Sequence, residues 1–243
     1  MKEKPEEEVE QLVEEEAEKS KGWNWGMIVV GVFVVFVLAG LSAPMVLRCK
    51  KAPERTQAIS NAKQVGLALL EFDQEFGSFP DEETAAMVKK SSETKLDLSG
   101  TSSNAMFRQL IAFGIQSEDI FYCLHPEGIR KPDRKMGPGK ALEAGEVGFS
   151  YLMNGNEGQN TSDNPGRAVL AAPMKIGTEE FWSKPYQGKA VILRLDNSVD
   201  APLIRKADGK VSVGNGKTLF DTGPETVWGN DGLVDVRHPE RGR

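Results

Sequence analysis

Few residues of this chain have the types and the spacing that catalysis or metal binding requires. Cys123 and His125 stand one residue apart and could supply two metal ligands, but no other residue continues a metal-ligand spacing around them. The second histidine, His238, also lies beside a proline in a loop-like stretch. Ser150 lacks the flanking glycines of a nucleophile elbow, and no pair of carboxylates stands out as a general acid and base. We therefore expect no enzyme, no catalytic residue, no bound metal and no cofactor.

The segment VGNGKT (Val213–Thr218) contains the glycine and lysine of a phosphate-binding loop. That motif requires a glycine five residues before Gly216 and a helix after it. Val211 occupies the position, within a strand-like run. The sequence therefore predicts a glycine turn rather than a nucleotide site.

A second polar cluster lies between two predicted strands. It offers oxygen ligands that could bind calcium, from Asp196, Asn197, Ser198 and Asp200, with Asp208 further along. Their spacing matches no EF-hand pattern, and the same residue types form local turns through their own side chains. Both interpretations stay open, and the turn is favoured.

The chain has two cysteines, Cys49 and Cys123. Two are too few for a disulfide scaffold, although they could pair with one another. Two unpaired thiols are the favoured alternative.

A long apolar stretch precedes the polar part of the chain. The sequence GMIVVGVFVVFVLAGLSAPMVL, Gly26–Leu47, carries no charge. At about 1.5 Å per residue, a helix of this length would cross a hydrocarbon core of ~30 Å. Trp23 and Trp25 stand at its start, where amphipathic rings anchor at a membrane surface. We expect a single transmembrane helix over residues 23–47, with membrane lipid as its partner.

The first 21 residues are strongly acidic, with nine Glu against four Lys and hence a net charge of −5. Since the whole chain carries −6, the remainder carries −1. No basic surface for nucleic acid is expected. An acidic leader also differs from the basic start of an ordinary secretory signal.

Beyond the apolar stretch the pattern becomes amphipathic. Apolar residues recur at intervals of three and four along one helical face: Ala58, Ala62, Val65, Leu69, Phe72 and Phe76. Gly77 and Pro80 end this helix. Pro44 predicts a kink within the apolar stretch, and Pro53 predicts either another kink or a fresh helix start.

Later segments alternate between short helices and short strands. Helices are expected over 81–90, with Asp81 as the N-cap, and over AMFRQLIAFG, with Asn104 as the N-cap. The segments that read as strands are 120–123, 147–153, 168–174, 190–197, 201–208 and 210–214. Residues 207–210 predict a hairpin turn.

The expected fold class is α+β, with a single transmembrane helix that continues into a long amphipathic helix packed on an antiparallel β-sheet. Five regions follow from the patterns. They are an acidic tail or leader (1–22), the transmembrane helix (23–47), the amphipathic helix (48–80), an α+β domain (81–221) and an irregular C-terminal tail (222–243).

This layout resembles bacterial type IV pilin-like proteins, and in particular the pseudopilins of type II secretion systems. Many of them have an apolar span followed by a pattern close to RxQCxxNLKQIGLALxxYxxxxGxFP. The matching residues here are Arg55, Gln57, Asn61, Lys63, Gln64, Gly66, Leu67, Ala68, Leu69, Gly77, Phe79 and Pro80. Cys123 after IFY, and the segment LIRKADGKVSV, resemble later parts of the same proteins.

The resemblance implies a pilin-like fold and a leader that a prepilin peptidase removes. The corresponding cut lies between Gly22 and Trp23. The relatives carry a Glu at the fifth mature position, which pairs with a neighbouring subunit during fibre assembly. Met27 stands at that position here, and the leader is acidic.

The expected function is that of a membrane-anchored, pseudopilin-like structural subunit of a type II secretion or type IV pilus-like assembly. Its partners would be itself or other pseudopilins, through the transmembrane helix, and the inner-membrane platform of the secretion system. The alternative is a non-polymerising, membrane-tethered binding or regulatory module that keeps the pilin-like fold.

The resemblance places this protein in the bacterial inner membrane as a single-pass protein, with its C-terminal domain outside. The basic residues after the span, Arg48, Lys50, Lys51 and Arg55, favour the opposite orientation.

Overall fold

The computed structural model describes residues 25–37, 52–230 and 232–242. The chain divides into two units, Met1–Lys50 and Lys51–Arg243. In the first unit, residues 25–37 form a helix whose large apolar side chains are exposed, as Phe36 is at 79 %.

The expected fold class was wrong in its transmembrane helix. Within the described residues, no helix has both the length and the apolar character needed to cross a membrane. The helix over 25–37 would extend for about 20 Å, against a hydrocarbon core of ~30 Å. The rest of the expected span, 23–24 and 38–47, lies outside the described residues.

The second unit is built on the helix α2 (Ala52–Phe76). The predicted apolar positions form its buried face, because Ala58, Ala62, Val65, Leu69 and Phe72 are all at most 1 % exposed. The helix ends at Gly77, which has a φ of +83° and donates its N–H to Asp73 O at 2.8 Å. A glycine adopts that conformation without steric cost, as the sequence predicted.

Two short helices follow α2. In α3 (Glu82–Ser92), Asp81 Oδ1 accepts the N–H of Thr84, and the Thr84 hydroxyl oxygen accepts the N–H of Asp81. This capping box confirms Asp81 as the N-cap. In α4 (Ser103–Phe113) the N-cap is Ser102 rather than Asn104. Asn104 is fully buried, and its amide donates to the carbonyl of Leu142 at 3.0 Å.

The main sheet has five antiparallel strands in the order β4-β3-β2-β1-β7. Their bounds are β1 (Ser150–Asn154), β2 (Ala168–Ala172), β3 (Val191–Arg194), β4 (Val199–Asp200) and β7 (Val234–Arg237). A separate hairpin joins β5 (Ser212–Gly214) to β6 (Lys217–Thr218). The unit is therefore α+β with an antiparallel sheet.

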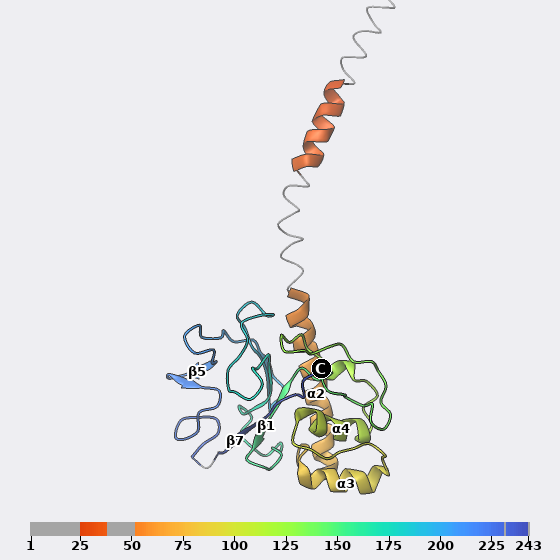
Figure 1. Cartoon of the computed structure of the whole chain (residues 1–243). Helices are drawn as coiled ribbons and strands as arrows, with labels where there is room; N and C mark the ends of the chain where they lie inside the picture. The colour runs from red at the N-terminus through yellow and green to blue at the C-terminus, as the bar shows by residue number, and fades with distance from the viewer. Residues whose placement is uncertain (1–24, 38–51, 231, 243) are drawn as a thin grey trace, which may run out of the picture. The chain divides into compact units, whose positions relative to one another are not determined.

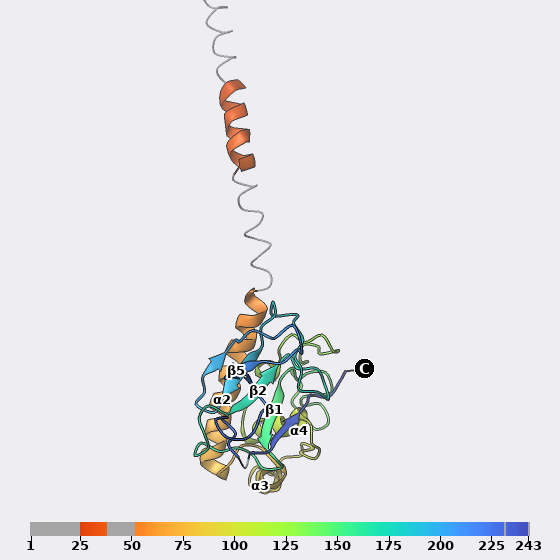
Figure 2. The same ribbon diagram turned by 90° about the vertical axis from the view of Figure 1, so that its left-hand side faces the viewer.

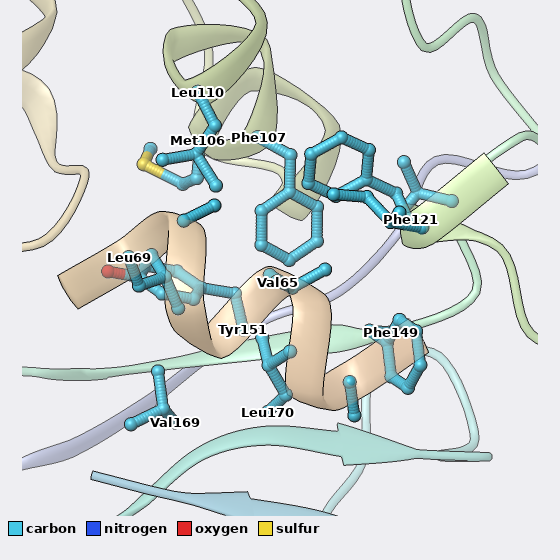
Figure 3. Packing of buried hydrophobic residues seen from close by; sticks show 14 of the residues in the cluster. Val65, Leu69, Met106, Phe107, Leu110, Phe121, Phe149, Tyr151, Val169 and Leu170 are labelled. Atoms are coloured by element: carbon cyan, nitrogen blue, oxygen red, sulfur yellow. The ribbon is translucent and has the colours of Figure 1, made fainter. Parts of the chain in front are cut away.

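The sheet is covered on both faces. Figures 1 and 2 show α2 and α4 on one face and the β5 region on the other. On the helical face, Phe107 of α4 lies between Phe121 and Tyr151, with ring centroids 5.0 and 5.8 Å away (Figure 3). On the other face a second cluster includes Phe181 and Trp228. Burial on both faces explains why all five residues of β2 are buried instead of every second one.

Three further expectations differ from the structure. Residues 201–208, expected as a strand, do not form one; Leu203 and Ile204 make only isolated bridges, to Lys189 and Val211. Residues 119–121 form a 3₁₀ turn, η1 (Asp119–Phe121), where IFYC had read as a strand. Within the tail that was expected to be irregular, β7 pairs with β1 along four residues. The VDVR run alternates apolar and polar residues, but four residues are too few to identify a strand from the pattern alone, and all four are only half-buried.

Candidate functional site

The solvent-facing side of α2 presents a regular row of side chains, which we call the outer stripe. It consists of exposed residues at intervals of three and four: Gln57, Ser60, Gln64, Leu67, Glu71 and Gln74. Leu67 is 53 % exposed, and most of its neighbours in the stripe are uncharged. Such a surface can pack against another helix without desolvating many charges.

The residues of the pilin-like pattern separate into two groups in the structure. Gln57, Lys63 and Gln64 are exposed, and Arg55 is half-buried. Asn61, Gly66, Phe79 and Pro80 instead face the interior, and Gly77 ends the helix as described above. The candidate cut between Gly22 and Trp23 lies outside the described residues.

Asn61 fastens α2 to η1. Its Nδ2 donates to two backbone carbonyls, those of Asp119 and Tyr122, each at 2.8 Å. Asn61 is 8 % exposed, so little water competes for these bonds. The amide gives the Tyr122 carbonyl a donor and adds a second donor to the Asp119 carbonyl, which also accepts the N–H of Tyr122 at 3.3 Å.

Gly66 is the point at which α2 comes closest to the turn between β3 and β4. A Cβ at this position would meet Asn197 Oδ1 at 2.1 Å and Leu193 Cδ1 at 3.1 Å. A larger residue would fit only if the side chains of Asn197 and Leu193 moved, so the glycine permits the close approach of helix and sheet.

The segment after α2 is held in place by backbone contacts. Phe79 N–H donates to Gln159 O at 2.7 Å, and Asp81 Oδ2 accepts the N–H of Gly158 at 3.0 Å. Phe79 and Pro80 are both buried. This part of the pattern therefore joins the end of the helix to the loop after β1, which is a structural role.

Cys123 and His125, the residues considered as metal ligands, are buried, and His125 makes hydrogen bonds to the backbone. His125 Nε2 lies 2.6 Å from Met174 O, and its Nδ1 accepts the N–H of Glu127 at 3.1 Å. Burial lowers the pKa of His125, which keeps the ring neutral. Burial also raises the pKa of the Cys123 thiol to about 12. Cys123 is unpaired, and Cys49 lies outside the described residues.

The polar cluster between β3 and β4 forms local contacts. Asp196 Oδ1 accepts the N–H of Ser198 at 2.9 Å, and Asp200 pairs with Arg194 at 2.6 Å. Asp208 pairs with Arg205. These contacts support the turn interpretation over a calcium site.

Residues 213–218 form the turn of the β5–β6 hairpin. Asn215 and Gly216 stand at its centre with φ angles of +47° and +74°. The glycine-turn prediction is confirmed, because this Asn-Gly pair has the geometry of a tight hairpin.

A groove of about 720 Å³ opens beside the turn at 207–209. Lys175 on its wall pairs with Glu180 at 2.5 Å and lies 5.3 Å from the ring centre of Trp182. Since Lys175 already has these partners, the groove does not present it as a free cation for a ligand.

A group of carboxylates that the sequence analysis missed joins the residue before η1 to the loop between η1 and β1. Oxygen atoms of Glu118, Asp133 and Glu146 lie within 4.8 Å of one another, and Glu118 and Glu146 are fully buried. Burial, followed by the nearby Glu146 and Asp133 charges, raises the pKa of Glu118. No motif spacing connects the three residues. Their only sequence signal is the length of the irregular segment that carries two of them.

No family model matches this chain, and no characterised protein or solved structure shows significant similarity to it. The resemblance to pilin-like proteins therefore stays a prediction.

Proposed function

We propose that this chain is a pseudopilin-like structural subunit, attached to the bacterial inner membrane by its N-terminal apolar segment. The observation that supports this most is the helix over 25–37, whose apolar side chains are exposed along its length. A helix of this kind is stable against lipid or against other apolar helices. In such a subunit, the second unit would be the part presented to neighbouring subunits.

In this proposal the outer stripe of α2 contacts a second copy of the chain. Leu67 would provide the apolar centre of the contact, and Gln57, Gln64 and Gln74 would provide hydrogen-bonding groups around it. The opposite face of α2 is committed to the core, so the stripe is the surface of the helix that assembly can use. Contacts with other pseudopilins and with a secretion platform would also be made through the outer stripe.

Two measurements on protein from native membranes test the proposal. The first is the N-terminal sequence, for which the expected start is Trp23. The second is oxidative cross-linking of a Leu67→Cys variant, made in a Cys49→Ser background. Because Cys123 is buried and unpaired, a disulfide-linked dimer would report a contact at position 67.

The matched control is Glu179→Cys, an exposed position outside α2. Dimers from Leu67→Cys and none from Glu179→Cys support the contact. An uncut N-terminus together with equal cross-linking of both variants would contradict the proposal.

The alternative is a non-polymerising binding or regulatory module with a pilin-like fold. Met27 favours it, because a methionine provides no carboxylate for a neighbouring N-terminus. An intact acidic leader and a monomeric second unit are the results expected from this alternative.

A further inference from the structure

The carboxylates Glu118, Asp133 and Glu146 come from distant parts of one irregular region. Glu118 immediately precedes η1, whereas Asp133 and Glu146 belong to the loop that connects η1 to β1. Asp133 N–H donates to Glu146 Oε1 at 3.1 Å, and Leu142 N–H donates to Glu118 Oε1 at 2.7 Å. Glu143 N–H also donates to Glu146 Oε2 at 2.8 Å, so backbone donors hold both oxygens of Glu146 but only one oxygen of Glu118.

The second oxygen of Glu118 has no such donor. Glu118 Oε2 is buried and has no hydrogen-bond partner, although the residue is fully inaccessible to solvent. A buried carboxylate oxygen without a partner costs free energy, which a proton or a cation would recover. The neighbouring acidic groups make a cation with more than one charge the more effective partner.

The basic side chains that the structure describes around the group pair with Glu146 and Asp133 but not with Glu118. Arg130 lies 3.2 Å from Glu146 Oε1, and Lys135 lies 2.8 Å from Asp133 Oδ2. Both side chains are about half or more exposed, at 49 % and 67 %, so these ion pairs are weak and easily exchanged. Within the part of the chain that the structure describes, Glu118 forms no ion pair with a basic side chain.

We propose that Glu118, Asp133 and Glu146 bind a calcium ion that fastens the 122–149 loop to η1. Carboxylate oxygens are hard ligands that suit Ca²⁺ and Mg²⁺. Ligands on one Ca²⁺ can be separated by up to about 5 Å, since each lies about 2.3–2.6 Å from the ion. The spread of 4.8 Å fits that limit. Octahedral Mg²⁺, with distances of about 2.0–2.1 Å, would require a tighter group.

The proposed ion acts on the loop. Asp133 and Glu146 are the loop residues that would be tied to Glu118, and Asp119 next to it already pairs with Arg134 at 2.9 Å. Calcium would therefore add a second link between the loop and η1, beside the ion pair of Arg134 with Asp119. This inference does not depend on whether the chain assembles with other copies.

The test measures thermal unfolding of the full-length chain in a mild detergent, with 10 mM CaCl₂ or with NaCl at the same ionic strength. For a dissociation constant of about 1 mM, calcium is expected to raise the Tm by ~3–6 °C. Isothermal titration with CaCl₂ should show one site per chain. Mg²⁺ at the same concentration should give a smaller shift.

Glu118→Gln removes the central ligand charge, and Asp133→Asn removes a second ligand at a half-buried position, where misfolding is less of a concern. Either variant is expected to reduce the calcium shift below ~1 °C. Glu143→Gln is the control in the same loop, because the Glu143 carboxylate pairs with Lys140 and with Arg130, which also reaches Glu146, but is not one of the three proposed ligands. It should keep the full shift.

Three results would overturn the proposal. One is a wild-type protein whose Tm and titration show no response to calcium. Another is an equal response in wild type, Glu118→Gln and Asp133→Asn. The third is a loss of the calcium-induced Tm shift in Glu143→Gln that equals the loss in Glu118→Gln and Asp133→Asn. If wild type does not respond and Glu118→Gln is more stable than wild type, the buried oxygen is satisfied by a proton rather than by a metal.

Discussion

The backbone of Gly66 in α2 lies directly against the side chain of Asn197 in the β3–β4 turn. A Cβ on Gly66 would stand 2.1 Å from Asn197 Oδ1, well inside the distance of ordinary van der Waals contact. Asn197 is held there by its own turn, with a φ of +62° and its N–H donated to Arg194 O at 3.0 Å. One glycine and one turn residue therefore fix how closely the helix packs on the sheet.

The first prediction follows from this contact. Gly66→Ala should lower the free energy of unfolding by about 1–3 kcal/mol, because the added methyl group overpacks the site. Elsewhere in an exposed helix the same substitution would stabilise the protein. Urea denaturation of wild type and variant measures the difference.

Asn197→Gly supplies the control, since a glycine accepts the positive φ and removes the obstructing oxygen. The double variant should recover most of the stability lost in Gly66→Ala. If the two changes are additive instead, the contact does not limit helix–sheet packing.

The second prediction concerns Asn61. Asn61→Ala should cost about 2–3 kcal/mol of unfolding free energy, because it removes two hydrogen bonds and leaves the buried carbonyl of Tyr122 without its side-chain donor. Gln64→Ala on the outer stripe is the comparison, with an expected change within ±0.5 kcal/mol. Equal effects of the two substitutions would contradict the structural role of Asn61.

The third prediction concerns pH. Burial lowers the pKa of His125; Met174 O and Glu127 oppose this shift, and Arg241 adds to it. Since the unfolded chain has the ordinary pKa of about 6.5, it binds a proton before the folded chain does. The contribution of His125 to stability is therefore complete above about pH 6.5 and decreases as the pH falls through its lowered folded value.

His125→Gln isolates this contribution. The stability difference between wild type and His125→Gln should shrink when the pH is lowered from 7.5 to 5. His238 is present in both proteins; burial lowers its pKa and the nearby charges of Glu127 and His125 modify it, so the difference reports His125 together with its coupling to His238. A difference that stays constant over this range would show that His125 does not titrate in the expected direction.

The fourth prediction concerns the Cys123 thiol. Its pKa of about 12 leaves very little thiolate at pH 8, and the side chain is 1 % exposed. In a Cys49→Ser background, iodoacetamide should modify the folded protein at least ~10³-fold more slowly than the unfolded protein. Mass spectrometry of the alkylated chain follows the reaction, and rapid modification under native conditions would contradict the burial.

Local signals predicted much of the second unit. The period of α2, its glycine stop and the Asp81 cap depend on residues within a few positions of one another, and the structure has all three. The runs around β1, β2 and β3 are similarly local. In contrast, β7 depends on a distant partner, because its backbone pairs with β1. The turn at 119–121 also depends on a distant residue, since Asn61 donates a hydrogen bond to the Asp119 carbonyl.

The candidate sites also differ in whether adjacent residues or residues distant in the sequence form them. The turn at Asn215-Gly216 could be predicted because its geometry requires adjacent residues of particular types. The group of Glu118, Asp133 and Glu146 could not, because an irregular loop brings the three carboxylates together. Likewise, the sequence pattern marked Asn61 and Gly66 without indicating that they hold the helix to the rest of the fold.

The pairing of β7 with β1 has a consequence for the order in which the fold is completed. β1, β2 and β3 each pair with the next strand along the chain, whereas Tyr151 of β1 pairs with Arg237. A pairing over such a separation requires the closure of a long loop, which is slow. Until β7 arrives, β1 is an open edge with unsatisfied backbone groups. During folding, this open edge could pair with a β-strand of another chain or be bound by a chaperone. By pairing with β1, β7 therefore removes an aggregation-prone edge as well as completing the sheet.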